Sequence, residues 1–219
     1  MANKIRVWDL PTRVFHWALV VCVLGLVVTG KVGGAWIDWH ARLGYAVLTL
    51  LLFRLVWGLV GGRWSRFSSF IYGPSSVINY LRGRAHPDHL IGHNPLGAGS
   101  VFAMLLVLLA QVGSGLVSDD EISFTGPLNR FVSSANGLLA TWYHKQVGQW
   151  LMIALVVLHI AAILFYLWKK KDNLIKPMLS GDKPGVAVSS RDDATSRLVA
   201  TVIFGICAAF VYWLVTMKA

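Results

Sequence analysis

The chain has 219 residues, of which 56% are hydrophobic and only 14% are charged. A soluble domain usually carries about 25% charged residues, so the composition excludes an ordinary soluble fold and favours a membrane protein. The net charge of +10 does not indicate a nucleic-acid partner, because the basic residues are few, lie between apolar stretches and form no nucleic-acid-binding motif. A lipid surface suits them better.

The first apolar stretch, residues 14–31, follows Lys4, Arg6 and Arg13 and carries His16 near its start. A basic start before an apolar run also describes a secretory signal peptide. We favour a membrane span, because the run is long for a signal peptide and four further apolar stretches follow it.

The second stretch, residues 40–60, begins at His40 and contains Arg54 close to its other end. An arginine inside a span either extends its side chain to the lipid headgroups or binds an anionic group. Both interpretations of Arg54 stay open.

The third stretch, residues 96–118, follows the sequence GHNPLGA, which contains His93 and Asn94. Asn94 followed by Pro95 is typical of a helix start. The same histidine and asparagine also suit the border of a quinone site, because a quinone carbonyl needs a hydrogen-bond donor and its reduction needs a proton source.

The fourth stretch, residues 146–168, follows His144 and contains His159. Fifteen helical residues advance by about 22 Å and leave the two side chains within about 60° of one another. Both rings therefore lie on one side of the helix at two depths.

The fifth stretch, residues 198–217, has no histidine and follows a segment rich in Lys, Asp, Ser, Gly and Pro. That composition predicts a flexible linker over residues 169–197. We therefore expect a four-helix membrane domain over residues 1–181, a cytoplasmic linker over 182–197 and an additional transmembrane helix over 198–219. The expected fold class is an all-α integral membrane protein.

The distribution of Lys and Arg predicts the orientation. Most of them lie before the first stretch, between the second and third, and between the fourth and fifth, so these segments should be cytoplasmic. The N-terminus is then cytoplasmic and the C-terminus lies outside. His40 and His144 share the outer level, while His16 and His159 lie toward the cytoplasmic level, where His93 is a rival partner for His16.

Histidines inside a membrane are costly and usually functional. Paired imidazoles from facing helices suit haem b, bound without covalent linkage, and two such haems would form an electron path across the bilayer. The alternatives are hydrogen-bonding packing residues, or a zinc or copper site, for which cysteine and carboxylate companions are missing at these depths. Arg13 and Arg54 are candidates for binding haem propionates on the cytoplasmic side.

A glycine follows two of these histidines by four residues, in HARLG and HKQVG. Gly44 and Gly148 therefore lie one turn beyond His40 and His144 on the same helix face. They either leave room for a porphyrin or serve ordinary close packing of helices.

Four segments together resemble the prokaryotic cytochrome b561 family, which includes the b-type cytochrome subunits of nickel–iron hydrogenases. They are RVWDLPTRVFHW, HARLGYAVLTLLLFRLVWG, GHNPLGA and HKQVGQWLMIALVVLHIAAIL. The resemblance covers roughly residues 4–181 and implies a four-helix bundle in the bacterial cytoplasmic membrane. It also implies two haems b, ligated by His16 with His159 and by His40 with His144. The fifth span departs from the smallest members.

The resemblance implies an electron-transfer oxidoreductase subunit that links the quinone pool to a periplasmic redox partner, such as a cytochrome c or a subunit of a dehydrogenase or hydrogenase. The alternative is a superoxide:quinone oxidoreductase that acts at the periplasmic face, and a third class is a haem-free scaffold or transporter. The sequence leaves open whether the chain forms a homodimer.

Overall fold

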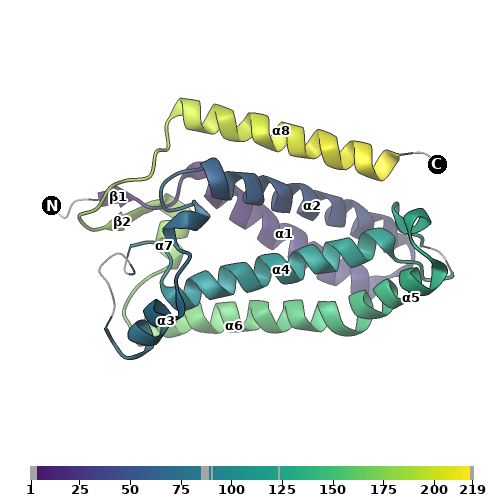
Figure 1. Ribbon diagram of the computed structural model, residues 1–219, viewed down its shortest axis with the longest axis horizontal. Coiled ribbons are helices and arrows are strands. Elements are labelled where there is room, and N and C mark those ends of the chain that lie inside the picture. The colour runs from purple at the N-terminus through teal and green to yellow at the C-terminus, as the bar shows by residue number, and fades with distance from the viewer. Residues whose placement is uncertain (1–3, 85–88, 90, 123, 218–219) are drawn as a thin grey trace. The chain divides into compact units, whose positions relative to one another are not determined.

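The computed structural model describes residues 4–84, 89, 91–122 and 124–217. By length and composition, five helical segments within them are long and apolar enough to cross a membrane (Figure 1). They are Leu10–Val32, Gly34–Val60, Pro95–Val117, Ser134–Trp168 and Ala194–Thr216. The expected all-α membrane fold with a fifth, C-terminal span is confirmed.

The long helices are α1, α2, α4, α6 and α8. Their bounds are Leu10–Val32, Ile37–Val60, Pro95–Val117, Gln149–Trp168 and Ala194–Thr216. A short 3₁₀ helix, Gly34–Trp36, directly precedes α2. Each predicted stretch corresponds to one of these helices.

The fourth span begins earlier than the sequence predicted. Helix α5, Ser134–Trp142, continues through a π-helical stretch, Tyr143–Gly148, into α6. Ser133 caps α5 by accepting a hydrogen bond from the backbone N–H of Asn136. The polar residues before position 146 predicted a loop, whereas this serine is a helix start signal.

Besides two 3₁₀ helices, Phe67–Ser69 and Asn129–Phe131, two short α-helices and two short strands complete the described elements. They are α3 (Pro74–Leu81), α7 (Ile175–Ser180), β1 (Lys4–Arg6) and β2 (Asp182–Pro184). Strands β1 and β2 pair antiparallel, with Ile5 opposite Lys183.

The chain divides into two compact units, and each is described by itself. Unit 1 comprises Met1–Phe15, Arg54–Ala103 and Val156–Ile203, and unit 2 comprises His16–Phe53, Met104–Leu155 and Phe204–Ala219. Unit 1 contains the β1–β2 pair and a core cluster of Ile5, Val7, Trp8 and Trp64.

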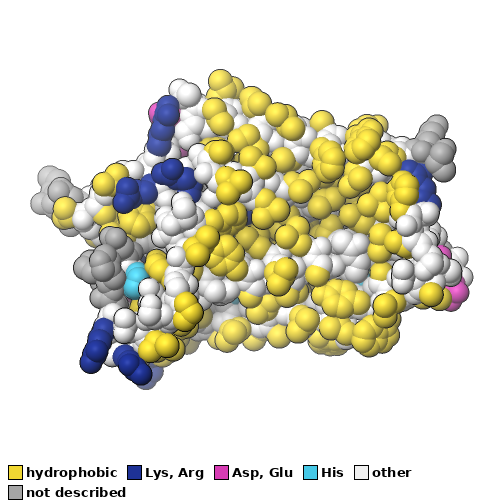
Figure 2. Space-filling model, viewed as in Figure 1, with side chains coloured by type: hydrophobic (Ala, Val, Ile, Leu, Met, Phe, Trp, Pro, Cys, Tyr) yellow, Lys and Arg dark blue, Asp and Glu magenta, His cyan; other side chains and the backbone are white. Residues whose placement is uncertain are grey.

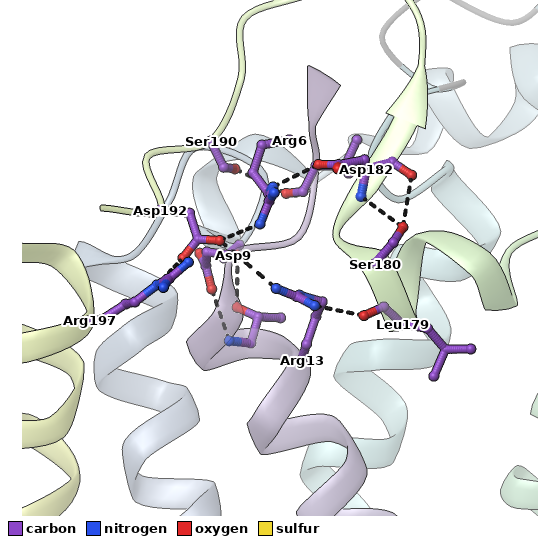
Figure 3. A network of polar contacts seen from close by, with 12 residues as sticks. Arg6, Asp9, Arg13, Leu179, Ser180, Asp182, Ser190, Asp192 and Arg197 are labelled. Atoms are coloured by element: carbon purple, nitrogen blue, oxygen red, sulfur yellow. Dashed lines mark hydrogen bonds and ion pairs between the residues drawn. The ribbon is translucent and has the colours of Figure 1, made fainter. Parts of the chain in front are cut away.

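The segment that we expected to be a flexible linker is ordered within unit 1. Strand β2 pairs with β1, and the hydroxyl of Ser190 donates to the carbonyl of Val7 at 3.0 Å. The side chain of Asp192 is only 4% exposed and accepts hydrogen bonds from Arg6 at 2.6 Å and Arg197 at 3.0 Å (Figure 3). The composition of this segment predicted flexibility, because the residues with which it pairs lie far away in the sequence and leave no local signal.

Hydrophobic side chains cover much of the helical surface that Figure 2 shows. Half of the most apolar 18-residue part of the second span is buried inside the protein, whereas only 6% of the corresponding part of the fourth span is buried. Apolar side chains that no protein atom covers are stable when lipid surrounds them, as the composition predicts for this chain.

Candidate functional site

The imidazole rings of His40 and His144 lie together in unit 2. His40 is in the first turns of α2, and His144 is in the π-helical stretch that leads into α6. Their ring centroids are 6.0 Å apart and their planes are inclined at 79°. The structure thus brings together the two histidines that the sequence predicted as an outer pair.

Each ring is oriented by a backbone carbonyl of a neighbouring helix. Nδ1 of His40 donates to the carbonyl of Leu26 on α1 at 3.0 Å, and Nδ1 of His144 donates to that of Gln111 on α4 at 2.9 Å. A carbonyl can only accept a hydrogen bond, so the proton lies on Nδ1 of both rings. Nε2 is then the unprotonated nitrogen, which is the form that ligates a metal.

A hydroxyl completes the surroundings of each Nδ1 atom. The hydroxyl oxygen of Thr29 lies 3.2 Å from Nδ1 of His40, and that of Ser114 lies 3.2 Å from Nδ1 of His144. Both hydroxyls also donate to carbonyls of their own helices. Each imidazole therefore has the same two kinds of polar neighbour.

A glycine leaves room for each ring. A β-carbon at Gly30 would lie 3.0 Å from Cε1 of His40, and one at Gly115 would lie 3.2 Å from Cε1 of His144. The sequences LVVTG, residues 26–30, and QVGSG, residues 111–115, thus place a carbonyl, a hydroxyl and a glycine at the same spacing. This repeat was not predicted from the sequence; its signal there is a Ser/Thr–Gly pair near the end of two apolar helices.

The separation of the rings fits an iron atom between them. A metal–imidazole bond of about 2 Å on each side, plus about 1 Å from each nitrogen to its ring centre, gives roughly 6 Å between centroids. Among the described residues, no three or more His, Cys, Asp or Glu side chains converge on one point. Two imidazoles at this separation suit a metal that a macrocycle already holds, so these residues fit haem.

The two glycines beyond the histidines differ in their surroundings. A β-carbon at Gly44 would meet nothing within 4 Å, so space is open there. A β-carbon at Gly148 would collide with the side-chain oxygen of Gln111, whose amide nitrogen donates to the carbonyl of His144 at 3.0 Å. Gly44 therefore suits porphyrin clearance, whereas Gly148 makes room for Gln111.

The second predicted pair is divided between the two units. His16 belongs to unit 2 and His159 to unit 1, so their pairing stays a prediction. His93 also belongs to unit 1, and its pKa is lowered first by burial and then by the charges of Arg54 and His159.

The two arginines predicted to bind propionates have different environments in unit 1. Arg13 donates from Nη1 to the carbonyl of Leu179 at 2.6 Å and lies 3.9 Å from Asp192 (Figure 3). Arg54 is only 3% exposed, and its Nη1 atom is buried without a hydrogen-bond partner. Nε of Arg13 is likewise buried without a partner, but the guanidinium of Arg13 already lies against the carboxylate of Asp192. Arg54 is therefore the stronger candidate for an anionic ligand.

Asn94 is a helix cap, as one of the two interpretations of the sequence predicted. Its side-chain oxygen accepts from the backbone N–H of Gly97 at 2.8 Å. Its amide nitrogen donates to the hydroxyl of Tyr166 at 2.9 Å, and that hydroxyl lies 2.6 Å from the hydroxyl of Tyr80. Burial, followed by the hydrogen bond to Tyr166, raises the pKa of Tyr80, which keeps its hydroxyl protonated.

Comparison with known proteins agrees with these observations. A probable Ni/Fe-hydrogenase 1 B-type cytochrome subunit from Escherichia coli K12 is 26% identical over 209 residues, which cover 80% of this chain and 88% of that protein. A probable Ni/Fe-hydrogenase B-type cytochrome subunit from Bradyrhizobium diazoefficiens is 23% identical over 217 residues, or 82% and 85% of the two chains. The corresponding protein from Cupriavidus necator is 25% identical over 211 residues, or 80% and 85%.

No solved structure matches the chain significantly. The model of one protein family, described as prokaryotic cytochrome b561, matches residues 7–181, which include all four predicted ligand histidines. With its five apolar helices and its facing imidazoles, the chain belongs to the prokaryotic cytochrome b561 family of b-type, electron-transferring membrane cytochromes.

Proposed function

We propose that the chain is a two-haem cytochrome that carries electrons across the bacterial cytoplasmic membrane, between the quinone pool and a redox protein on the periplasmic side. The observation that carries this proposal is the arrangement of His40 and His144, with their rings 6.0 Å apart and both Nδ1 atoms bound to carbonyls. The five long apolar helices support this proposal, because an electron carrier between the two sides of a membrane needs its site inside a lipid-facing protein.

The protein residues hold and orient the proposed haems. His40 and His144 ligate the haem nearer the periplasm, and His16 and His159 ligate the haem nearer the cytoplasm. Arg54, with Arg13 as the weaker candidate, binds a propionate of the second haem. When bound, each haem supplies an iron that accepts and donates one electron.

The relatives named as hydrogenase cytochrome subunits suggest the kind of periplasmic partner. They are probable Ni/Fe-hydrogenase subunits and align with at least 80% of this chain. We infer that the partner is a subunit of a hydrogenase-type enzyme. The orientation in this proposal, with the N-terminus cytoplasmic and the C-terminus periplasmic, rests on the distribution of Lys and Arg.

The quinone is proposed to bind at the cytoplasmic end, beside the turn that carries His93 and Asn94. The hydroxyls of Tyr80 and Tyr166 lie next to the Asn94 amide and form a hydrogen-bonded group in unit 1. Neutral hydroxyls and an amide offer donors to a quinone carbonyl. Residues 1–181 form the haem-binding part in this proposal, and α8 is an addition to it.

The haem content of the purified chain tests the proposal. Two haems b per chain and a low-spin reduced-minus-oxidised spectrum are expected, and quinol should reduce the haems. The His40→Ala and His144→Ala variants should each lose one haem, and it should be the same haem. The His89→Ala variant replaces a histidine outside both pairs and should keep both haems.

Several outcomes would contradict this function. A colourless preparation from haem-sufficient cells would reject a cytochrome, and full haem content in His144→Ala would reject the periplasmic pair. Rapid turnover of superoxide by the isolated chain with quinone, in the absence of a protein partner, would favour the superoxide oxidoreductase instead.

A further inference from the structure

Arg54 is a buried cation without a complete set of partners. Its side chain lies on α2 and is 3% exposed, and its guanidinium carbon stacks 4.6 Å from the ring centre of Phe67. The stacking covers one face of the guanidinium, but Nη1 is buried and makes no hydrogen bond. A buried charge without a partner is strongly unfavourable, so such a group usually binds an anion.

The acidic side chain that acts electrostatically on Arg54 is already fully hydrogen-bonded. Asp9 is completely buried, and one oxygen accepts from the backbone N–H of Thr12 at 2.8 Å and from the indole of Trp57 at 3.2 Å. The other accepts from the backbone N–H of Gly62 at 3.1 Å and from the hydroxyl of Ser65 at 2.7 Å. These four donors hold Asp9 in place, and it forms no ion pair with Arg54.

A second buried polar atom in unit 1 lacks a hydrogen-bond partner. The ring of His93 packs between Trp8 and Phe70, at centroid distances of 4.7 Å and 4.4 Å, and its Nδ1 atom is buried without a partner. Phe70 in turn contacts Phe67, the ring under Arg54, at 5.8 Å. A continuous set of aromatic contacts therefore joins the two side chains.

His93 is electrically neutral in this environment. Burial, followed by the charge of Arg54 and the proximity of His159, lowers the pKa of His93 to about 3. A neutral imidazole can donate one hydrogen bond without adding charge. Arg54 and His93 together thus offer one positive charge and two donors, which match the charge and the acceptors of one carboxylate.

We propose that Nη1 of Arg54 and Nδ1 of His93 bind one carboxylate, and that this carboxylate is a propionate of the haem ligated by His159. The assignment rests on the proposed function, because a haem near His159 would bring its propionates close to His93. It gives His93 a cofactor-positioning role and leaves Asn94, Tyr80 and Tyr166 for the quinone. The other source of a carboxylate in a membrane is a fatty acid.

The test combines a change in the protein with a change in the haem. The full-length chain is stripped of haem in detergent and reconstituted either with haem b or with its dimethyl ester, in which both propionates are uncharged. The affinities of the two forms for the cytoplasmic-side site are compared in the wild type, in Arg54→Met and in Arg54→Lys. The control is Arg63→Met, since Arg63 is an exposed arginine that also stacks on a ring, that of Trp64.

The wild type should bind the ester roughly 10-fold or more weakly than haem b, because a charge-assisted hydrogen bond is lost. The ratio of the affinity for haem b to the affinity for the ester should fall toward one in Arg54→Met. Arg54→Lys should retain part of this ratio, and Arg63→Met should retain all of it. His93→Leu should lower the ratio to a smaller extent. Because each ratio is taken within one variant, a general loss of stability cancels.

An unchanged ratio in Arg54→Met would overturn the proposal while leaving the two-haem cytochrome intact. A wild type that binds no haem would instead reject the proposed function. If a fatty acid were the ligand, the ester would bind as well as haem b in every variant, and oleate would raise the melting temperature of the haem-free wild type but not of Arg54→Met. That result would also overturn the assignment to a propionate.

Discussion

Ser114 and His144 donate to the same acceptor. The hydroxyl of Ser114 and Nδ1 of His144 both lie 2.9 Å from the carbonyl oxygen of Gln111. At the other imidazole, the hydroxyl of Thr29 donates to the carbonyl of Gly25 at 2.7 Å and only at 3.3 Å to that of Leu26. Thr29 therefore competes less with His40 for the carbonyl of Leu26. The two imidazoles therefore differ in how strongly the carbonyl accepts from Nδ1.

Replacing Ser114 by alanine should lower the midpoint potential of the haem that we propose between His40 and His144. Without the competing hydroxyl, the carbonyl of Gln111 accepts more strongly from Nδ1, which makes the ligand more basic and favours ferric iron. A change of one neutral hydrogen bond corresponds to a shift on the order of 20–60 mV. Thr29→Val is the matched control and should lower the midpoint potential by a smaller amount. Equal shifts in the two variants, or a rise in the potential of Ser114→Ala, would contradict this explanation. Spectroelectrochemical titration measures both.

The inclination of the axial rings predicts a spectroscopic signature. Imidazole planes at 79° to one another leave the iron d-orbitals that they interact with nearly equal in energy. The oxidised haem of this pair should therefore give the highly anisotropic low-spin signal of near-perpendicular ligands in electron paramagnetic resonance at low temperature. The rhombic spectrum that parallel ring planes produce would show that the rings rotate when haem binds.

Gly44→Ala separates porphyrin clearance from helix packing. A β-carbon there meets no protein atom within 4 Å, so the haem-free chain should lose no stability and should gain up to about 1 kcal/mol from the better helix propensity of alanine. Haem content should nevertheless fall if the porphyrin occupies that space. Gly205→Ala on α8 is the control, because its surroundings are equally open and it lies on a helix without histidines. Equal haem content in both variants would assign Gly44 no role in clearance.

Asp192→Asn should reduce stability in a pH-dependent way. Burial raises the pKa of Asp192, but the hydrogen bond and charge of Arg197, together with Arg6, outweigh it and leave the pKa below its ordinary value. The stabilisation is therefore present above the unfolded pKa of about 3.9 and is lost as the pH falls through the folded pKa. We expect a decrease in the free energy of unfolding of roughly 1–3 kcal/mol at pH 7.

Thermal unfolding in detergent at several pH values measures this difference. The gap between the wild type and Asp192→Asn should close as the solution becomes acidic. Asp193→Asn is the control, since Asp193 is exposed and pairs with the exposed Arg191, and should change stability little. A gap that persists below the folded pKa would show that Asp192 stabilises the chain by packing rather than by charge.

The sequence was sufficient for features that depend on one helix at a time. Hydropathy predicted the five spans, and the positions of His40 and His144 at the outer ends of two spans placed them at one level. The carbonyls of Leu26 and Gln111, by contrast, depend on how neighbouring helices rotate against each other, which no single periodicity reveals. Helix α5 was missed because Ser133 caps it within a segment whose polar residues resemble a loop.

Long-range charge pairing was also beyond the sequence pattern. Arg6 and Asp192 are 186 residues apart, so nothing in the local composition connects them. The unpaired Nη1 of Arg54 was likewise invisible, because both the stacking on Phe67 and the saturation of Asp9 depend on tertiary contacts. A buried arginine could be noticed in the sequence, but its missing partner could only be seen in three dimensions.

The pairing of Arg6 with Asp192 has a consequence for biosynthesis. Arg6 leaves the ribosome before its partner, which is translated 186 residues later, shortly before α8. The contacts that join Arg6 to Asp192 therefore cannot form until the chain has been translated through residue 192. A chain terminated before residue 182 would lack both β2 and Asp192, so Arg6 would lose its ion pairs with Asp182 and Asp192, and Arg13 would lose its contact with Asp192.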